Sequence, residues 1–212
     1  MDNRAASMLA LASVLALGGQ ASPALAADTT WTVVNPNADG GFNAVSGSLT
    51  VKNGAGETLF TCQSIDAGGT MQSRSITSAA TPVLGQFTWA RANSCVDGGG
   101  GSWVGSLAGS YVFHYFNAAG YNAATGTTTF NQLQPSLFNF YTAGSSRCFF
   151  TIKAKGMTYT NATSTLKTTK AEVLLGNDES GPSCQGLLTQ GETITFATEY
   201  KFTPAIKITA TS

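Results

Sequence analysis

The chain contains an internal repeat, and this repeat constrains the fold more than any other feature of the sequence. The segment 42–51 (FNAVSGSLTV) and the segment 121–130 (YNAATGTTTF) agree by identity or residue type at eight positions. Two cysteines follow each segment, and a Tyr-x-Phe motif comes sixteen residues after the second cysteine in both cases. Because these features recur in the same order, we predict two similar units at about 42–116 and 121–204.

The cysteines are interpreted through the same repeat. Cys62 and Cys95 are 33 residues apart, and Cys148 and Cys184 are 36 apart, although four cysteines alone would allow three pairings. If each unit was once self-contained, the bridges are Cys62–Cys95 and Cys148–Cys184. Loops of this size would stabilise the fold by about 3–4 kcal/mol each in the chain-entropy model. The chain has no C-x-x-C pair, so we expect no zinc site.

Hydrophobic residues alternate with a period of two, which is typical of strands. In the segment 192–202 the residues Ile194, Phe196, Tyr200 and Phe202 share one side, so we expect this side to face the core. Shorter alternating runs are separated by turns rich in Gly and Asn, and the turn at 53–56 predicts a hairpin between 48–52 and 58–63. We therefore predict an all-β fold, a β-sandwich or a barrel-like structure, and favour the sandwich.

The N-terminus resembles a secretory signal peptide. A short polar start carries one arginine, an apolar run covers 5–17, and Ala24-Leu25-Ala26 is a small-x-small cleavage motif. We predict a signal peptide at 1–26 and a secreted, extracellular β domain at 27–212. The apolar run is short for a membrane span, and no later segment resembles one.

Charge is scarce and balanced. Only 10% of residues are charged, with 11 basic and 11 acidic side chains in the chain, so its formal net charge is zero. Without a positive field the chain has no electrostatic means of gathering nucleic acid, and we exclude nucleic acid as a partner.

Two parts of the sequence are relevant to family membership: the segment 121–128, and a closing pattern that begins with Cys-x-Gly-Leu-Leu-x-x-Gly at Cys184 and runs on to Tyr200, Phe202 and Pro204. Both resemble a group of small secreted actinobacterial proteins. No activity is known for this group. The resemblance implies export and an all-β fold and transfers no catalytic residue.

The sequence contains no recognisable catalytic set. His114 is the only histidine, no G-x-S-x-G motif accompanies it, and the repeat matches it to Thr203 in the second unit. We therefore interpret His114 as a surface or inter-unit residue. A pair of carboxylates could still form a glycoside hydrolase, but most acidic residues lie in turns or on outward faces of strands. The acidic residues at 177–180 lack the spacing of a calcium loop. We predict no enzyme, no cofactor and no metal.

Aromatic residues give the best argument for binding. Trp89 lies in an alternating run and is expected in the core, whereas Trp103 follows four glycines and could be buried or exposed. If an aromatic residue contacts a ligand, we expect it to be Trp103. Val112, His114 and Phe116 replace water-compatible residues of the second unit, so they are expected either to pack against the other half or to form an external binding patch. A bulge could instead turn them into the core of their own unit.

These features favour a non-catalytic extracellular protein that binds or pads the cell envelope, with cell-wall glycan or an envelope protein as partner. A first alternative is a carrier or inhibitor that holds a small apolar ligand or a protein partner between the halves. A carboxylate-based glycoside hydrolase is a second alternative. A ligand-sized apolar cavity would favour the carrier, and a flat aromatic surface would favour the glycan binder.

Overall fold

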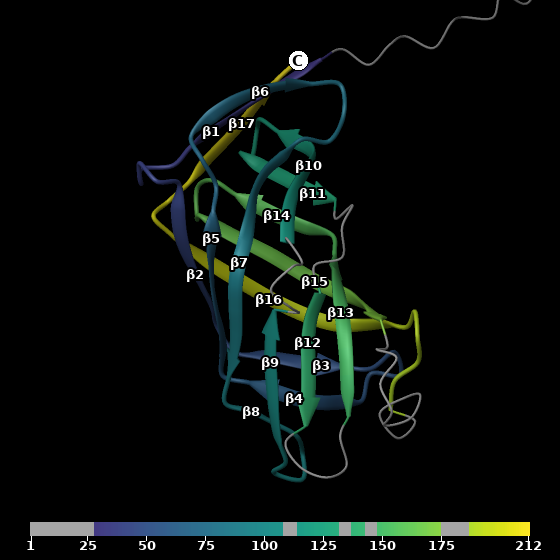
Figure 1. The fold of residues 1–212 in the computed structure, drawn as a ribbon. Helices are drawn as coiled ribbons and strands as arrows, with labels where there is room; N and C mark the ends of the chain where they lie inside the picture. Colours follow the sequence, from purple (N-terminus) through teal and green to yellow (C-terminus); the bar gives the residue numbers. More distant parts are fainter. Residues whose placement is uncertain (1–27, 108–113, 132–136, 143–147, 175–186) are drawn as a thin grey trace, which may run out of the picture.

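The computed structural model describes residues 28–107, 114–131, 137–142, 148–174 and 187–212. Within these residues the regular structure is β-strand, and no helix occurs (Figure 1). The all-β prediction is confirmed. The predicted signal peptide lies outside the described residues.

The strands in chain order are as follows: β1 Thr29–Val34, β2 Gly41–Ser46, β3 Leu49–Lys52, β4 Thr58–Cys62, β5 Ser64–Thr70, β6 Arg74–Ser78, β7 Val83–Asn93, β8 Cys95–Val96, β9 Ser102–Leu107, β10 His114–Asn122, β11 Thr127–Asn131, β12 Leu137–Thr142, β13 Phe149–Lys155, β14 Met157–Thr160, β15 Thr165–Leu174, β16 Thr193–Thr203 and β17 Lys207–Thr211.

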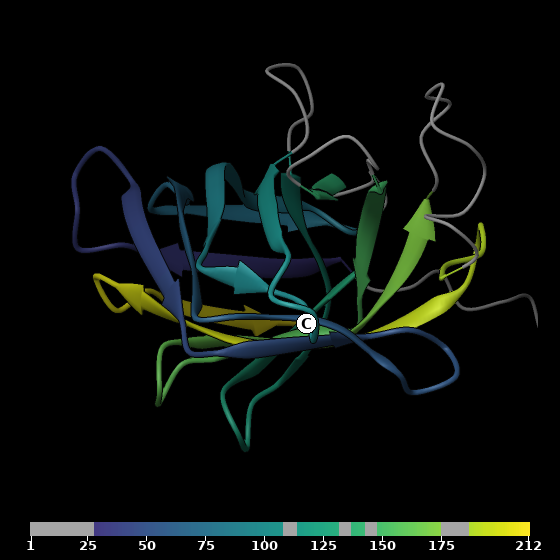
Figure 2. The same ribbon diagram turned by 90° about the horizontal axis from the view of Figure 1, so that it is seen from below.

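Fourteen of these strands form one antiparallel sheet that returns on itself. One closed ring of pairings runs β7-β5-β2-β16-β15-β14-β11-β10 and back to β7. A second closed ring runs β16-β3-β4-β8-β9-β12-β13-β15 and back to β16. The two rings share the long strands β15 and β16, and Figure 2 shows the strands enclosing an interior rather than lying in one flat layer. The remaining strands form a small sheet in the order β17-β1-β6 at one end of the molecule (Figure 1).

Two strand predictions are confirmed in detail. In β16 every second residue is buried, and the buried side carries Ile194, Phe196, Tyr200 and Phe202. The predicted hairpin is formed by β3 and β4, which pair from Leu49↔Cys62 to Lys52↔Thr58. In the intervening turn the amide of Gly56 donates to the carbonyl of Asn53.

The two predicted units share one hydrophobic core. Phe116, from the first unit, contacts Phe42 of its own unit and also Phe130 and Phe202 of the second, with ring centroids 5.4–6.3 Å apart. In addition, each closed ring takes strands from both units. The halves therefore pack as one body around a continuous interior.

The disulfide Cys62–Cys95 is present and joins β4 to β8, as the repeat predicted. Cys184 lies outside the described residues, so its bridge to Cys148 stays a prediction. The two matching decapeptides pair differently: 121–130 forms the hairpin β10–β11, whereas the strands in 42–51, β2 and β3, both lie against β16. The unit boundaries likewise stay a prediction.

Candidate functional site

The outer face of β2, β5 and β7 carries an exposed tryptophan. Trp89 on β7 is 46% exposed, and its strand neighbour on β5 is Gly68. A Cβ atom added to Gly68 would lie 2.4 Å from Nε1, 2.7 Å from Cε2 and 2.9 Å from Cζ2 of Trp89. The indole edge formed by Nε1, Cε2 and Cζ2 therefore covers the glycine, and about half of the Trp89 side chain is exposed to solvent.

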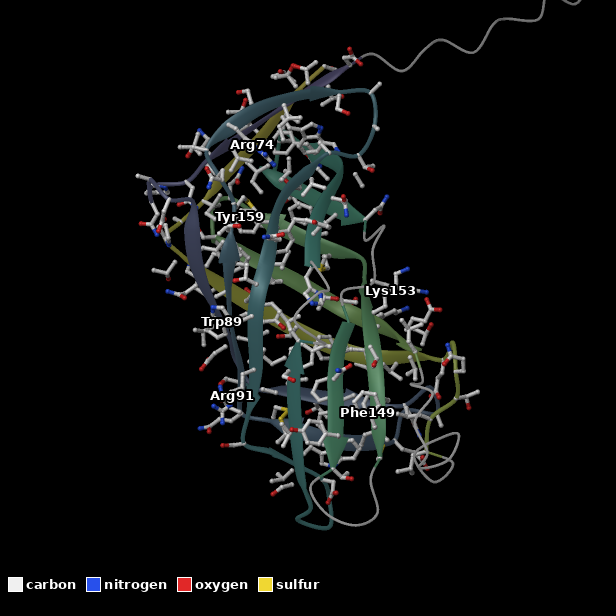
Figure 3. The ribbon with its side chains drawn as sticks, viewed as in Figure 1. Arg74, Trp89, Arg91, Phe149, Lys153 and Tyr159 are labelled. Carbon is white, nitrogen blue, oxygen red and sulfur yellow. A yellow bond between two sulfur atoms is a disulfide. The ribbon has the colours of Figure 1, made fainter. Side chains whose placement is uncertain are left out.

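Polar side chains surround this ring in two rows of cross-strand neighbours. Asn43 pairs with Gly68 on the side away from Trp89, and the next row on the same face is Val45–Asp66–Arg91. Asn43, Val45 and Arg91 are exposed and Asp66 is half-buried. Figure 3 shows Trp89 and Arg91 on this side of the molecule. We call the set Asn43, Val45, Asp66, Trp89 and Arg91 the Trp89 face.

The prediction that Trp89 lies in the core is wrong, and a β-bulge explains why. Gly68 pairs with Trp89 but Gly69 pairs with Phe87, so Thr88 is an extra residue on β7. An extra residue reverses the alternation of the side chains that follow it. Phe87 therefore packs against the core while Trp89 points outward, and Ala90 points inward again. The glycine pair of β5 is the sequence signal for this, because glycine within a strand often marks a bulge or a close approach.

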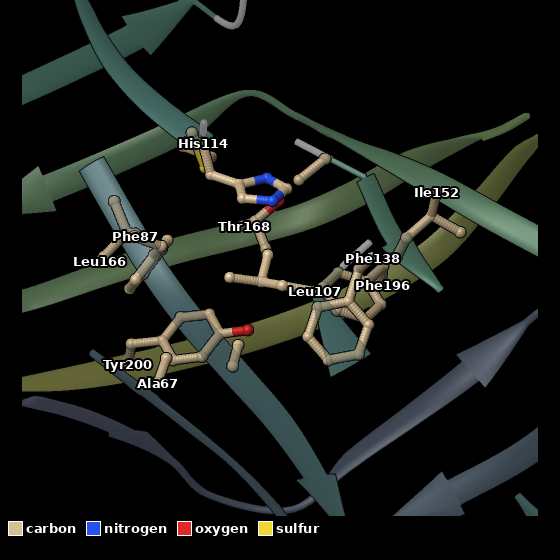
Figure 4. Close-up of a pocket in the computed structure, with 13 residues that line it drawn as sticks. Ala67, Phe87, Leu107, His114, Phe138, Ile152, Leu166, Thr168, Phe196 and Tyr200 are labelled. Carbon is tan, nitrogen blue, oxygen red and sulfur yellow. The ribbon is translucent and has the colours of Figure 1, made fainter. Parts of the chain in front are cut away.

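The interior contains a cavity of about 50 Å³ between the two halves (Figure 4). Its lining is almost entirely apolar and consists of Ala67, Phe87, Ala90, Leu107, His114, Phe138, Ile152, Ala154, Met157, Leu166, Thr168, Phe196 and Tyr200. This volume exceeds the roughly 10–15 Å³ that one water needs, but is far below the roughly 300 Å³ of the smaller drug-binding pockets.

His114 supplies the unusual polar group of this cavity. The residue is 2% exposed, and neither Nδ1 nor Nε2 has a hydrogen-bond partner. Desolvation by burial lowers the pKa of His114 from 6.5 to about 4, so the imidazole is neutral at pH 7. Tyr200 lies across the cavity, and burial raises the pKa of its hydroxyl well above the ordinary value. Figure 4 shows the imidazole and this hydroxyl pointing into the same space.

Of the two placements expected for Val112, His114 and Phe116, the described residues show packing against the other half and no external patch. His114 and Phe116 are 2% and 1% exposed, because β10 pairs with β7 through His114↔Phe87 and Phe116↔Gly85 and turns both side chains inward. His114 is therefore not a surface residue; it lines the cavity between the halves, which agrees with the inter-unit alternative. Val112 lies outside the described residues.

Trp103, the aromatic residue expected to contact a ligand if any does, is a buried packing residue. It is 6% exposed and stacks on Phe60 with ring centroids 4.6 Å apart. Its indole nitrogen donates to Oδ2 of Asp97 over 3.1 Å. The Gly101 amide and this indole lower the pKa of Asp97. The glycine run therefore forms a turn that fixes Trp103, and a surface contact through its ring is excluded in this conformation.

The charged residues form no recognisable reaction centre in the described part of the chain. Every carboxylate there is exposed or half-buried, and no group of three or more His, Cys, Asp or Glu side chains could hold a metal. The acidic cluster at 177–180 lies outside the described residues. Among the residues that the structure describes, no helix is long and apolar enough to cross a membrane.

Known proteins give no guide to either region. No protein-family model, curated protein or solved structure matches this chain. The Trp89 face and the cavity must therefore be interpreted from their own chemistry.

Proposed function

We propose that this protein is a non-catalytic binding protein of the cell exterior that holds a saccharide of the cell envelope on the Trp89 face. Export rests on the predicted signal peptide, and the disulfide Cys62–Cys95 is typical of exported proteins. The observation that carries the proposal is the solvent-facing indole of Trp89 over Gly68.

A sugar ring is amphipathic, with C–H groups on its faces and hydroxyls at its rim. An indole face matches the C–H groups, because it is large, apolar and carries negative quadrupolar charge. Gly68 makes a flat arrangement possible, since any side chain there would meet the indole. Val45, two strands away on the same face, is an exposed apolar side chain as well.

The polar residues of the Trp89 face fit the rim of such a ring. Residues two apart on a strand are separated by about 7 Å, and strands lie about 4.8 Å apart. Arg91, Asp66 and Asn43 are therefore placed around a ring stacked on Trp89. Together they offer guanidinium donors, carboxylate acceptors and an amide that does both. Hydroxyl groups of a saccharide require this mixture.

The test is retention of the purified chain from residue 27 on insoluble cell-wall polysaccharide. We expect wild type to be retained and Trp89→Ala to bind at least about tenfold more weakly, which corresponds to about 1.4 kcal/mol. Tyr141→Ala is the matched control, because Tyr141 is another exposed aromatic residue. It is 39% exposed and lies on β12, in the second closed ring of strands.

Three results would contradict the proposal. The first is no retention of wild type on any envelope polysaccharide. The second is equal retention of wild type and Trp89→Ala. The third is an equal loss of retention in Trp89→Ala and Tyr141→Ala, which would indicate nonspecific adhesion through exposed aromatic side chains.

A further inference from the structure

We infer that the cavity around His114 is a second binding site, which takes one small neutral molecule with an apolar body and a hydroxyl group. This site is separate from the Trp89 face. Phe87 and Ala90 line the cavity from β7, whereas Trp89 points away from it on the same strand.

The unpartnered imidazole is the observation that points to a ligand. Buried polar atoms in proteins almost always have hydrogen-bond partners, and one without a partner costs about the desolvation of that group. A neutral imidazole offers one donor and one acceptor, and His114 uses neither within the protein. A hydroxyl can donate to the acceptor nitrogen or accept from the N–H, so it would supply a partner that the fold lacks.

The other residues that line the cavity determine the charge and polarity of the rest of the ligand. Leu107, Phe138, Ile152 and Phe196 present apolar side chains to the cavity, and the described residues of the lining include no charged side chain that could neutralise an ion. Burying an unpaired charge here would be very unfavourable. The ligand is therefore neutral, and most of its surface is hydrocarbon.

Polar groups in the lining other than His114 are few. The hydroxyl of Thr168 is already engaged with the carbonyls of Lys155 and Lys170, over 3.2 and 3.3 Å. The hydroxyl of Tyr200 points into the same space as the imidazole (Figure 4). A ligand of this cavity therefore needs one polar end, placed at His114.

The volume limits the ligand to a few non-hydrogen atoms. About 50 Å³ is room for more than one water, but is below the roughly 150 Å³ of an engineered cavity that binds benzene. A short aliphatic alcohol has the matching size and chemistry. A lipid, a nucleotide or an intact sugar exceeds this volume.

The experiment uses straight-chain alcohols from methanol to 1-hexanol as probes. Because His114 is the only histidine in the chain, its imidazole ¹⁵N signals report on the site without ambiguity. We expect saturable shifts of these signals, with affinity that rises with chain length as apolar surface is buried and falls once the cavity is full.

Two variants test the two parts of the proposal. His114→Phe keeps an aromatic ring and removes both nitrogens, so we expect 1-propanol to bind about threefold to tenfold more weakly, detected through the ligand's own signals. Ala90→Leu keeps His114 but fills space from β7, so we expect saturable binding to disappear. If His114→Phe fails to fold, Ala90→Leu still decides the matter.

The inference would be overturned by any of three outcomes: ¹⁵N signals that do not respond to any alcohol, a response that grows linearly without saturating, or equal affinity in wild type and Ala90→Leu. None of these outcomes depends on saccharide binding at Trp89.

Discussion

The cavity and the Trp89 face lie on opposite sides of β7, and each reverses the usual distribution of polarity. Inside, a polar imidazole without a hydrogen-bond partner lies among apolar side chains. Outside, a large apolar ring lies among Asn43, Asp66 and Arg91. Buried polar groups without partners and exposed large apolar groups are the informative exceptions to the rule of polar outside and apolar inside.

One β-bulge shapes both regions. The bulge at Thr88 directs Phe87 and Ala90 toward the cavity and leaves Trp89 on the outer face. Without the extra residue, regular alternation would place Trp89 on the same side as Phe87. The difference between the regions therefore has energetic consequences that can be measured separately. Changes inside should affect stability and alcohol binding, and changes outside should affect saccharide binding.

The largest effect is expected for Phe116→Ala. Phe116 is 1% exposed and contacts aromatic rings of both halves. Deleting a buried phenylalanine costs about 3–5 kcal/mol, from the lost transfer free energy and from the cavity that remains. Chemical denaturation should show this decrease in the free energy of unfolding. A loss below about 1 kcal/mol would mean that the halves do not share a packed interior at this position.

Acidification should reveal the buried histidine. Because the pKa of His114 is about 4 in the folded state and 6.5 ordinarily, the unfolded chain binds more protons between these values. The contribution of a neutral His114 is fully present above pH 6.5 and is lost as the pH falls toward 4. The decrease is about 3 kcal/mol at 1.36 kcal/mol per pKa unit.

Comparison with His114→Phe isolates this effect, since carboxylates also begin to titrate in the same range. The difference in unfolding free energy between wild type and His114→Phe should grow as the pH falls from 7 to 4. Parallel curves for the two proteins would show that His114 is hydrated in the folded state.

The sequence predicted those elements that depend on nearby residues or on the internal repeat. The alternation in β16, the glycine turn between β3 and β4 and the spacing of Cys62 and Cys95 each depend on neighbouring residues or on the repeat, and each is confirmed. Period-two alternation specifies which residues share a side as long as the strand is regular. It cannot specify where the alternation is interrupted.

The candidate site was missed for this reason. Trp89 was predicted in the core because 87–91 alternates in the sequence, and the bulge that reverses it depends on pairing with Gly68 and Gly69 from another strand. The inward orientation of His114 likewise depends on its pairing with Phe87. Similar decapeptides can also pair with different strands, because strand pairing is decided by the whole sheet. The segment 42–51 forms β2 and β3, which both pair with β16, whereas 121–130 forms β10 and β11, which pair with each other.

A comparison of two adjacent glycines would sharpen the account of the bulge. A Cβ at Gly69 would lie 2.0 Å from the carbonyl oxygen of Gln86, which is backbone and cannot move alone. The three atoms nearest to a Cβ at Gly68 all belong to the side chain of Trp89, which can rotate away. We expect Gly69→Ala to lose about 1–3 kcal/mol of stability and Gly68→Ala clearly less. Equal losses in denaturation would contradict the proposed packing of Trp89 over Gly68.

The smallest effect on stability is expected for Trp89→Ala, although this residue is as large as any in the core. Trp89 is 46% exposed and is not part of the hydrophobic core cluster. Surface substitutions of this kind usually change the free energy of unfolding by about 0.5 kcal/mol or less. Since the proposed function assigns saccharide binding to the same indole, Trp89→Ala should separate the two properties: a nearly unchanged denaturation midpoint together with weakened retention on polysaccharide.

The double variant Gly68→Ala/Trp89→Ala should be about as stable as Trp89→Ala, because the added methyl group no longer meets the indole. A loss of several kcal/mol in Trp89→Ala would instead make the ring a structural component of the sheet, and the contrast between the outer face and the interior would no longer hold.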